Sequence, residues 1–440
     1  MGATYKRLAV VCCFSLCAFA ALAQTRTSQT PRHHATNSEV VPAVTDAEAA
    51  IDKKDYAAAE PLLRKAVSEN PGDYRAWFDL GFVLNAMGRK DEATEAYRKS
   101  VAANPSVFES NLNLGLMLAQ AGDPQAERYL RAATRLKPTA HPEEGLERAW
   151  LSLGRVLAAT KPDEALTAFR EAARLQPGDP EPHLSAGMAL ESQRQLTAAA
   201  EEFSAAARLD PKSGEALAGL ANVYQKLGRM AEAEAALRNY VGLYPENAAA
   251  HFQLGRVLAA ANKPDEAISE FTTGLRLSPK DPEARRELTA LHLSKKNYSQ
   301  AEGDYRLLLE QNPTNAEAHF GLGRALMEQH KFVQAQQEFL SAVKLKPDFA
   351  QVYGDLAIVA SENRDYVLTL RALAARARTL PEVPGTYFLR ATAYDHLKDA
   401  KNAAESYRQF LAVANGKYPE QEWQARHRLK AIEPDARGKK

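Results

Sequence analysis

Prolines recur along this chain at an almost constant interval. From Pro177 to Pro381 each interval in the series is 34 residues, and the earlier members keep nearly the same spacing. The series comprises Pro71, Pro105, Pro138, Pro177, Pro211, Pro245, Pro279, Pro313, Pro347 and Pro381. Because a proline cannot continue a helix and keeps the preceding residue extended, each one predicts a helix end and a turn. The period therefore predicts an array of short repeated units that stack to form a core.

Between successive prolines the apolar residues follow a helical spacing. In the unit that follows Pro71 the first group has intervals of three, four and seven residues, which places it on one helix face. It consists of Trp77, Leu80, Gly81 and Leu84, and a second group consists of Ala93, Tyr97 and Ser100. Gly88 and Arg89 lie between the groups and are expected to end the first helix. Each unit is thus predicted to be a helical hairpin, with a glycine where the two backbones pack closely.

This pattern resembles the tetratricopeptide repeat, whose signature is Trp-x2-Leu-Gly-x2-Tyr followed by Ala, a large apolar residue, Ala and Pro. The resemblance covers about residues 40–419, or eleven units, and clear copies begin at Trp150 and His319. It implies an all-α, right-handed α-solenoid of about eleven hairpins. We place the array at residues 45–419, with an insertion at 139–146 and Thr289 where a glycine is expected.

The C-terminal segment is expected to close the array. Residues 420–440 predict a capping helix, with Trp423, Leu429 and Ile432 on its packed side, followed by a basic tail. A repeat array needs such a cap because each unit buries its apolar face only against its neighbours.

The N-terminus has the pattern of an export signal. Lys6 and Arg7 precede an apolar run over residues 8–20, and Ala21-Leu22-Ala23 forms a small-x-small cleavage site. We expect residues 1–23 to be a cleaved signal peptide and residues 24–44 a disordered linker. The three cysteines lie inside the signal, so the mature chain would have no disulfide or thiolate site. These features predict a periplasmic or secreted protein that is not inserted in the membrane after cleavage.

No sequence pattern of a catalytic or metal site is recognisable. The chain has no glycine-rich phosphate loop, Gly-x-Ser-x-Gly or His-Glu-x-x-His. His183, His251 and His319 are spaced by 68 residues and occupy the tryptophan position of their units, which favours a packing role. The net charge is +1 and the basic residues are dispersed among acids, so nucleic acid is not an expected partner. We expect a non-enzyme without cofactor or metal.

The resemblance implies that one stripe of each first helix faces a concave groove that binds peptides. The stripe combines the residue after the tryptophan position with the residue after the glycine. The candidate groove residues are Phe78, Phe82, Asn85, Arg155, Asn222, Phe252, Arg256, Phe320, Arg324 and Phe388. The phenylalanines either meet a ligand or pack against the next repeat. Arg155, Arg256 and Arg324 either bind a ligand carboxylate or pair with a neighbouring glutamate.

The expected function is a non-catalytic scaffold that binds a peptide or protein segment in this groove within the cell envelope. Two alternatives stay open: an accessory or regulatory subunit of an envelope enzyme or polysaccharide-synthesis complex, and a carbohydrate-binding solenoid. The family's carboxylate clamp for C-terminal peptides combines Lys and Asn at set positions. Asn85 and Asn222 lack a companion lysine at the required place, which disfavours a receptor of that kind.

Overall fold

The structure, a computed structural model, describes residues 42–433, and every regular element within that range is an α-helix. This confirms the predicted all-α repeat fold. The predicted signal peptide 1–23 and the tail 437–440 lie outside the described residues. Of the predicted linker 24–44 only the last three residues are described, and they begin α2 at Pro42. None of the described helices is long and apolar enough to cross a membrane.

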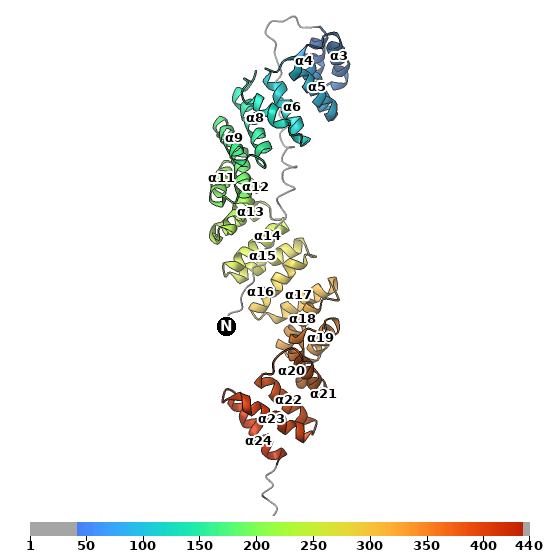
Figure 1. Cartoon of the computed structure of the whole chain (residues 1–440), viewed down its shortest axis with the longest axis vertical. Helices are drawn as coiled ribbons and strands as arrows, with labels where there is room; N and C mark the ends of the chain where they lie inside the picture. The colour runs from blue at the N-terminus through green and yellow to red at the C-terminus, as the bar shows by residue number, and fades with distance from the viewer. Residues whose placement is uncertain (1–41, 434–440) are drawn as a thin grey trace, which may run out of the picture. The chain divides into compact units, whose positions relative to one another are not determined.

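The chain divides into two compact units, Met1–Leu227 and Gly228–Lys440. The first contains α2 (Pro42–Asp52), α3 (Tyr56–Glu69), α4 (Tyr74–Ala86), α5 (Lys90–Ala103), α6 (Phe108–Gln120), α7 (Ala126–Ala133), α8 (Pro142–Leu157), α9 (Pro162–Leu175), α10 (Glu181–Ser192), α11 (Leu196–Leu209) and α12 (Gly214–Lys226). Helices α2 to α11 pack as five successive hairpins, each docked on the next (Figure 1).

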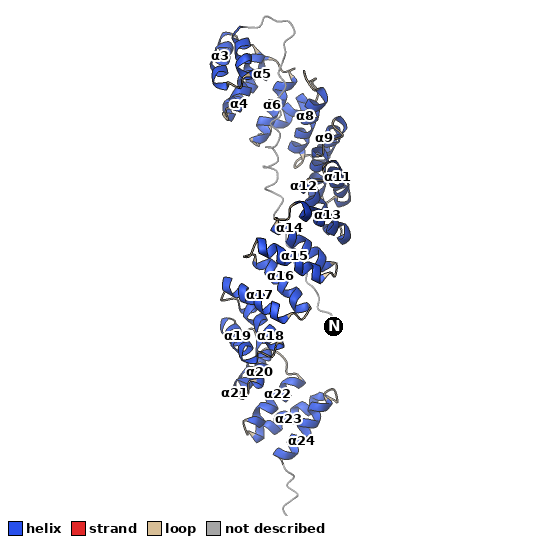
Figure 2. Cartoon of the chain, turned by 180° about the vertical axis from the view of Figure 1, so that it is seen from behind, coloured by secondary structure: helices blue, strands red, loops and turns tan. Residues whose placement is uncertain are grey.

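The second unit repeats this arrangement. It contains α13 (Met230–Leu243), α14 (Ala248–Ala260), α15 (Pro264–Leu277), α16 (Pro282–Ser294), α17 (Tyr298–Gln311), α18 (Ala316–Glu328), α19 (Phe332–Leu345), α20 (Ala350–Glu362), α21 (Tyr366–Arg376), α22 (Pro384–His396), α23 (Ala400–Ala414) and α24 (Pro419–Ile432). Helices α14 to α23 pack as five further hairpins. Figure 2 shows the described helices of both units without an intervening strand.

Helix ends follow local capping chemistry. Asp73 caps α4 by accepting a hydrogen bond from the backbone N–H of Arg75 at 2.9 Å, and Asn315 caps α18 in the same way. Gly88, the predicted break after the first helix, has a positive φ of 80°. A residue without a Cβ adopts this left-handed conformation at little cost, and the chain can therefore reverse there into α5.

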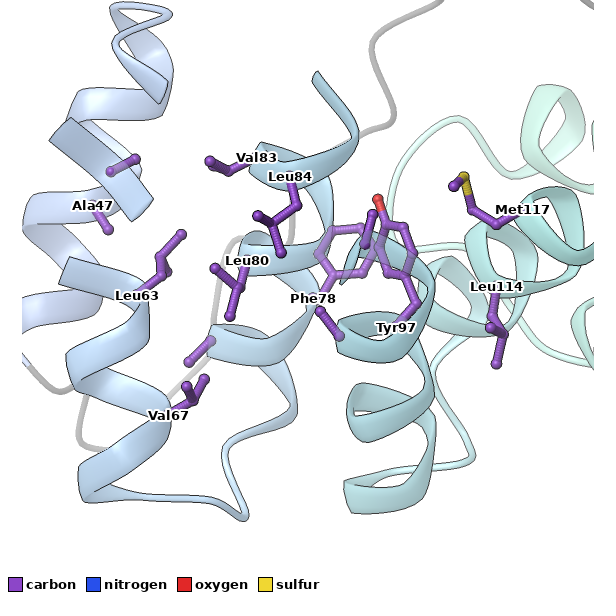
Figure 3. Close-up of a cluster of buried hydrophobic side chains, with 14 of the residues drawn as sticks. Ala47, Leu63, Val67, Phe78, Leu80, Val83, Leu84, Tyr97, Leu114 and Met117 are labelled. Atoms are coloured by element: carbon purple, nitrogen blue, oxygen red, sulfur yellow. The ribbon is translucent and has the colours of Figure 1, made fainter. Parts of the chain in front are cut away.

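In five hairpins the glycine of the first helix lies under an aromatic ring of the partner helix, namely in α4, α8, α10, α14 and α18. A Cβ added to Gly81 would lie 2.8 Å from the Tyr97 ring, and one added to Gly323 would lie 2.5 Å from the Phe339 ring. Both distances are shorter than van der Waals contact, so only glycine allows the two helices to approach this closely. Figure 3 shows Tyr97 beside Phe78, with Leu80 and Leu84 on the same first helix. The predicted packing role of the glycine fits this geometry.

In six repeats the tryptophan position anchors the turn that precedes the first helix. Trp77 donates a hydrogen bond from Nε1 to the carbonyl oxygen of Pro71, six residues earlier, at 3.0 Å. Tyr353 donates from its hydroxyl to the Pro347 carbonyl oxygen at 2.9 Å. Different side chains thus make the same contact, because each of them carries a polar group at the end of a long, packed side chain.

Thr289 changes how its hairpin packs. It occupies the glycine position, is buried, and donates its hydroxyl to the Arg285 carbonyl oxygen at 2.7 Å. The aromatic residue of its partner helix, Tyr305, instead lies over Gly321 of the following repeat, where an added Cβ would overlap its ring. The departure in sequence therefore shifts an aromatic contact from within a hairpin to between hairpins.

The insertion at residues 139–146 adds packing on the outside of α6. It supplies the first turn of α8, which at 16 residues is longer than the other first helices. A Cβ added to Gly145 would lie 3.2 Å from the Phe108 ring, and Thr139 donates its backbone N–H to Glu109 at 2.9 Å. Phe108 and Glu109 are consequently buried. The equivalent residues of α4, Tyr74 and Arg75, are only half-buried.

Helix α24 packs against α23 of the last hairpin. Leu429 and Ile432 pack against a cluster that contains Phe410 and Ala425. Trp423 does not: 66% of it is exposed, and its ring stacks on His427. The prediction that Trp423 belongs to the packed side was therefore wrong, because Ala425 takes its place at the helical interval that faces the core.

Candidate functional site

The two positions of the predicted stripe have different environments. The position after the glycine is half-buried or exposed in every repeat. It is occupied by Phe82, Leu116, Arg155, Met188, Asn222, Arg256, Ala290, Arg324, Ile358 and Thr392. The position after the tryptophan is buried in five of the ten repeats and exposed in only two, at Ala218 and Arg286. We call the accessible series the first-helix stripe.

The phenylalanines after the tryptophan position belong to the core. Phe78 and Phe252 are buried, and their rings lie 5.7 Å from Tyr97 and 6.2 Å from Phe271, centroid to centroid. This corrects the expectation that they line an accessible groove. The alternative was that these rings pack against the next repeat. For Phe78 and Phe252 the aromatic partners, Tyr97 and Phe271, instead lie in the same hairpin.

The other predicted aromatic residues are half-buried. Phe320 lies 5.9 Å from Phe339 on the partner helix, and Phe388 lies 5.1 Å from Phe410 on its partner helix. Phe320 also meets Phe349, at the start of the next repeat, edge-on at 5.1 Å, so the alternative of packing against the next repeat is correct for this ring. Phe82 belongs to the first-helix stripe and meets Tyr56 edge-on at 6.2 Å. These three rings keep an accessible edge while most of their area is covered by protein.

The three arginines of the first-helix stripe pair with acids on the next first helix. Arg155 forms an ion pair with Glu181 and donates from Nε to Ser185 at 3.3 Å. Arg256 donates from Nε to Glu287 at 2.8 Å. The sequence left open whether these arginines bind a ligand or a neighbouring acid, and the structure describes the neighbouring acid. No sequence motif marks the acceptors, because they lie on a different repeat.

Arg324 is the least engaged of the three. Its Nε lies 3.6 Å from an Asp355 oxygen, beyond hydrogen-bond distance, and its guanidinium lies over the Phe320 ring at 5.8 Å. The exposed fractions of the three arginine side chains rise from 32% at Arg155 to 43% at Arg256 and 58% at Arg324. Burial raises the pKa of Asp355, which the charge of Arg324 only partly offsets.

Asn222 belongs to a polar cluster that sequence reasoning missed. Its amide donates to Glu191 at 2.6 Å, and Lys226, one turn later on the same helix, donates to that carboxylate at 2.7 Å. A lysine therefore does accompany Asn222, and the chain's own Glu191 lies between the two donors. Asn85 is exposed at the end of α4.

The histidines at the tryptophan position have structural partners. Nδ1 of His251 lies 2.6 Å from Glu270, and Nε2 lies 3.0 Å from the Pro245 carbonyl oxygen. His319 repeats both contacts, with Glu338 and Pro313. Within residues 42–433 no cluster of three or more His, Cys, Asp or Glu side chains is arranged to hold a metal.

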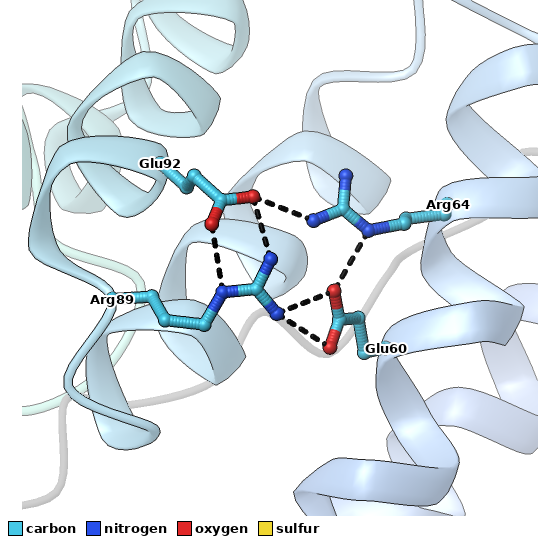
Figure 4. Close-up of polar contacts among 4 residues, drawn as sticks. All are labelled: Glu60, Arg64, Arg89 and Glu92. Carbon is cyan, nitrogen blue, oxygen red and sulfur yellow. Dashed lines mark hydrogen bonds and ion pairs between the residues drawn. The ribbon is translucent and has the colours of Figure 1, made fainter.

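Second helices carry ion clusters that sequence reasoning attributed only to helix N-termini. In Figure 4, Arg64 donates to Glu60 and Glu92, and Arg89 donates to the same two carboxylates, all at 2.6–2.9 Å. A glutamate and an arginine one turn apart on one second helix thus meet a cation and an acid at the start of the next. We call these groups junction clusters. Related clusters contain Glu127, Arg131, Lys161 and Glu164; Glu234, Arg238, Lys263 and Glu266; and Glu302, Arg306 and Lys331.

These contacts lower the pKa of the carboxylates. The hydrogen bond from Arg64 holds the pKa of Glu60 below its usual range, against the opposing effect of burial. For Glu302 the largest single influence is burial, which raises its pKa. Hydrogen bonds from Lys331, Arg306 and Gln329 together outweigh burial and lower the pKa to about 2. These contacts therefore favour the ionised form of Glu60 and Glu302.

Comparison with proteins of known sequence gives partial matches. The human tetratricopeptide repeat protein 7B is 31% identical over 126 residues, which are 28% of this chain and 14% of that protein. Protein 7A is 28% identical over 120 residues, 27% of this chain and 13% of its own length. The chain thus matches about one seventh of the length of these relatives.

Solved structures resemble parts of the chain at low scores. YrrB, a tetratricopeptide protein described as having an unusual peptide-binding site, matches with a TM-score of 0.38 and 23% identity over 42% of this chain and 96% of its own. MamA matches with a TM-score of 0.35 and 19% identity over 39% and 94%. Yeast Tom70 matches with a TM-score of 0.31 and 15% identity, and the match covers 90% of this chain and 96% of Tom70.

Family models agree with the hairpin geometry. Three models of the tetratricopeptide repeat match residues 50–112, 155–214, 219–282, 292–358 and 384–416. Together these stretches make up more than half of the chain, and each begins and ends within the packed hairpins. The chain belongs to the tetratricopeptide repeat family.

Proposed function

We propose that this chain is a non-catalytic scaffold that binds an extended segment of another protein along the first-helix stripe. Tetratricopeptide repeat proteins are generally interaction scaffolds, which supports a protein partner. Within each unit, the first-helix stripe is the proposed binding surface. The proposed place of action is the cell envelope, supported by the N-terminal pattern of residues 1–23.

The accessible arginine series carries this proposal. Arg155, Arg256 and Arg324 occupy one position in three repeats, and each faces an acid of the next first helix. Exposed ion pairs contribute about 0–1 kcal/mol each, so a ligand carboxylate can replace the internal acid at little cost. An arginine can then bind that carboxylate with two hydrogen bonds, which fixes the direction of the bound segment.

The burial of the aromatic residues bears on the alternatives. A carbohydrate-binding solenoid needs aromatic faces open to the sugar, whereas Phe78 and Phe252 are buried in their hairpins. A protein segment is therefore the favoured ligand. Asn222 and Lys226 offer a second place for a ligand carboxylate. In the structure both side chains donate to Glu191, and a ligand carboxylate would replace it.

The test compares two matched sets of arginines in the exported protein. A photoreactive residue at Ala290, on the stripe, is expected to cross-link a partner in the native cell. Changing Arg155, Arg256 and Arg324 to Ala should reduce the cross-linked yield. The control changes Arg64, Arg238 and Arg306, which are paired and similarly exposed on second helices.

The outcomes separate binding from folding. If the control set lowers the yield as much as the stripe set, the arginines act through stability and the proposed site is wrong. Retention of full yield in the stripe set, with unchanged helicity, also contradicts it.

A further inference from the structure

An apolar surface interrupts the charged second helices at α19 and α21. Val333 is 65% exposed, Leu340 39% and Val367 48%. We call these three residues, with the neighbouring Lys344 and Arg371, the α19–α21 patch. Large aliphatic side chains this exposed in a cluster are typical of an interaction surface rather than of free surface.

The helical intervals place the residues of each helix on one face. On α19, Val333, Leu340 and Lys344 are separated by seven and four residues. These intervals place all three on the same side of the helix. Val367 and Arg371 have the corresponding four-residue interval on α21. Asn363, just before α21, donates to the Phe332 carbonyl oxygen at 3.1 Å and joins the two helices at this point.

Positions that form junction clusters elsewhere are apolar here. Arg306 of α17 and Arg64 of α3 occupy the ninth position of their second helices and bind glutamates. Leu340 has that position on α19. The third position of the next second helix, occupied by Glu92 in the first cluster, is Leu368 on α21. The ionic contact between second helices is therefore replaced by two leucines.

The patch is confined to these two helices. The position of Val333 and Val367 is occupied by Ser299 on α17 and by Lys401 on α23. Both neighbouring second helices thus present polar side chains at the same place. Single exposed aliphatic side chains do occur on other second helices, such as Leu307 on α17 and Val413 on α23, but the position shared by Val333 and Val367 is apolar in both members of this adjacent pair.

The cations of the patch have no acidic partner among residues 42–433. Lys344 and Arg371 are exposed, and neither forms an ion pair or a side-chain hydrogen bond within the described chain. The arginines of the junction clusters, such as Arg64, Arg238 and Arg306, are instead paired with glutamates. The patch therefore combines aliphatic side chains with uncompensated positive charge.

We propose that the α19–α21 patch docks an acidic amphipathic helix of a partner protein. The aliphatic face of such a helix covers Val333, Leu340 and Val367, and acids along its flank pair with Lys344 and Arg371. This site lies on second helices, so it is separate from the first-helix stripe and extends the proposed function to a second partner contact.

A designed peptide pair tests the stated chemistry on the full chain. One peptide of about 20 residues has Leu at helical intervals of three and four with Glu on its flanks, and its twin has Lys in place of every Glu. Fluorescence anisotropy should show binding of the acidic peptide and at least about tenfold weaker binding of the basic twin. Equal binding of both peptides, or no binding of the acidic one, overturns the proposal.

Variants locate the site. Val333→Ser with Val367→Ser should weaken the acidic peptide about tenfold, because aliphatic burial is lost. Lys344→Glu with Arg371→Glu should reverse the preference toward the basic peptide. The matched control, Ser299→Ala with Lys401→Ala, should change neither affinity. A control that weakens binding equally overturns the location. So does sedimentation showing a dimer that the serine variant abolishes, since a second copy would then cover the patch.

Discussion

Two adjacent residues of α18, Gly323 and Arg324, have opposite constraints. Gly323 lies under the Phe339 ring, where even one added carbon would overlap. Arg324 points to the other side of the helix, is largely exposed and makes one loose contact with Asp355. Packing thus determines one face of each first helix, while the neighbouring face can vary in charge from repeat to repeat. This difference separates residues that hold the array together from residues available to a ligand.

Removing an interior ring is expected to have the largest effect. Phe203 is fully buried and lies over Gly187 of its own hairpin and Gly219 of the next. Phe203→Ala should lower the free energy of unfolding by about 3–5 kcal/mol, since it leaves a cavity between two hairpins. Urea titration followed by circular dichroism measures the change. Leu209→Ala, on the same helix but exposed, is the control and should stay within about 0.5 kcal/mol.

Two glycines in neighbouring helices test whether close packing is what requires glycine in a first helix. Gly323→Ala places a Cβ against the Phe339 ring and should destabilise the protein by about 1–3 kcal/mol. Gly303→Ala on α17 meets no atom within 4 Å and should stabilise it by about 0.5–1 kcal/mol, because alanine is the better helix former. Thermal unfolding of both variants shows whether each substitution raises or lowers the stability of the protein. The same sign for both would contradict the packing role of Gly323.

The junction clusters predict a loss of stability in acid. The pKa of Glu302 is lowered from 4.5 to about 2, so the folded state favours its ionised form. Its contribution, about 1 kcal/mol after allowing for solvent screening, is present above pH 4.5 and is lost as the pH falls toward 2. The stability difference between the wild-type protein and Glu302→Gln should shrink over that window in urea titrations. Glu310→Gln, on the exposed side of the same helix, is the control; an equal pH-dependent difference there would contradict the assignment.

The repeating fold was predictable because each hairpin uses the same local contacts. The proline period, the glycine under an aromatic ring and the break at Gly88 are all encoded within one unit of sequence. The five hairpins described in each unit follow that expectation. Trp423 was misplaced because α24 has no repeat partner to indicate its buried face, and Ala425 faces the core instead.

The candidate site was less predictable because its contacts cross between repeats. Nothing near Arg256 in sequence indicates Glu287, which lies on the next first helix. The stripe assignment also treated two positions alike, although the interval after the tryptophan turns Phe252 toward its partner helix. Junction clusters carry a usable signal, a glutamate and an arginine four residues apart followed by a cation at the next second helix. It becomes visible once the hairpins are stacked.

The smallest effects are expected where the stripe arginines act on stability alone. Arg256→Ala removes a hydrogen-bonded pair with Glu287 and should lower the free energy of unfolding by about 0.5 kcal/mol. Arg324→Ala should cost less, because its contact with Asp355 is longer and more exposed. In 1 M salt, where the screening length is about 3 Å, the difference between the two variants should vanish in urea titrations. A cost above about 2 kcal/mol for Arg324→Ala would place that residue with Gly323 among the packing determinants, and the distinction between the two faces of α18 would fail.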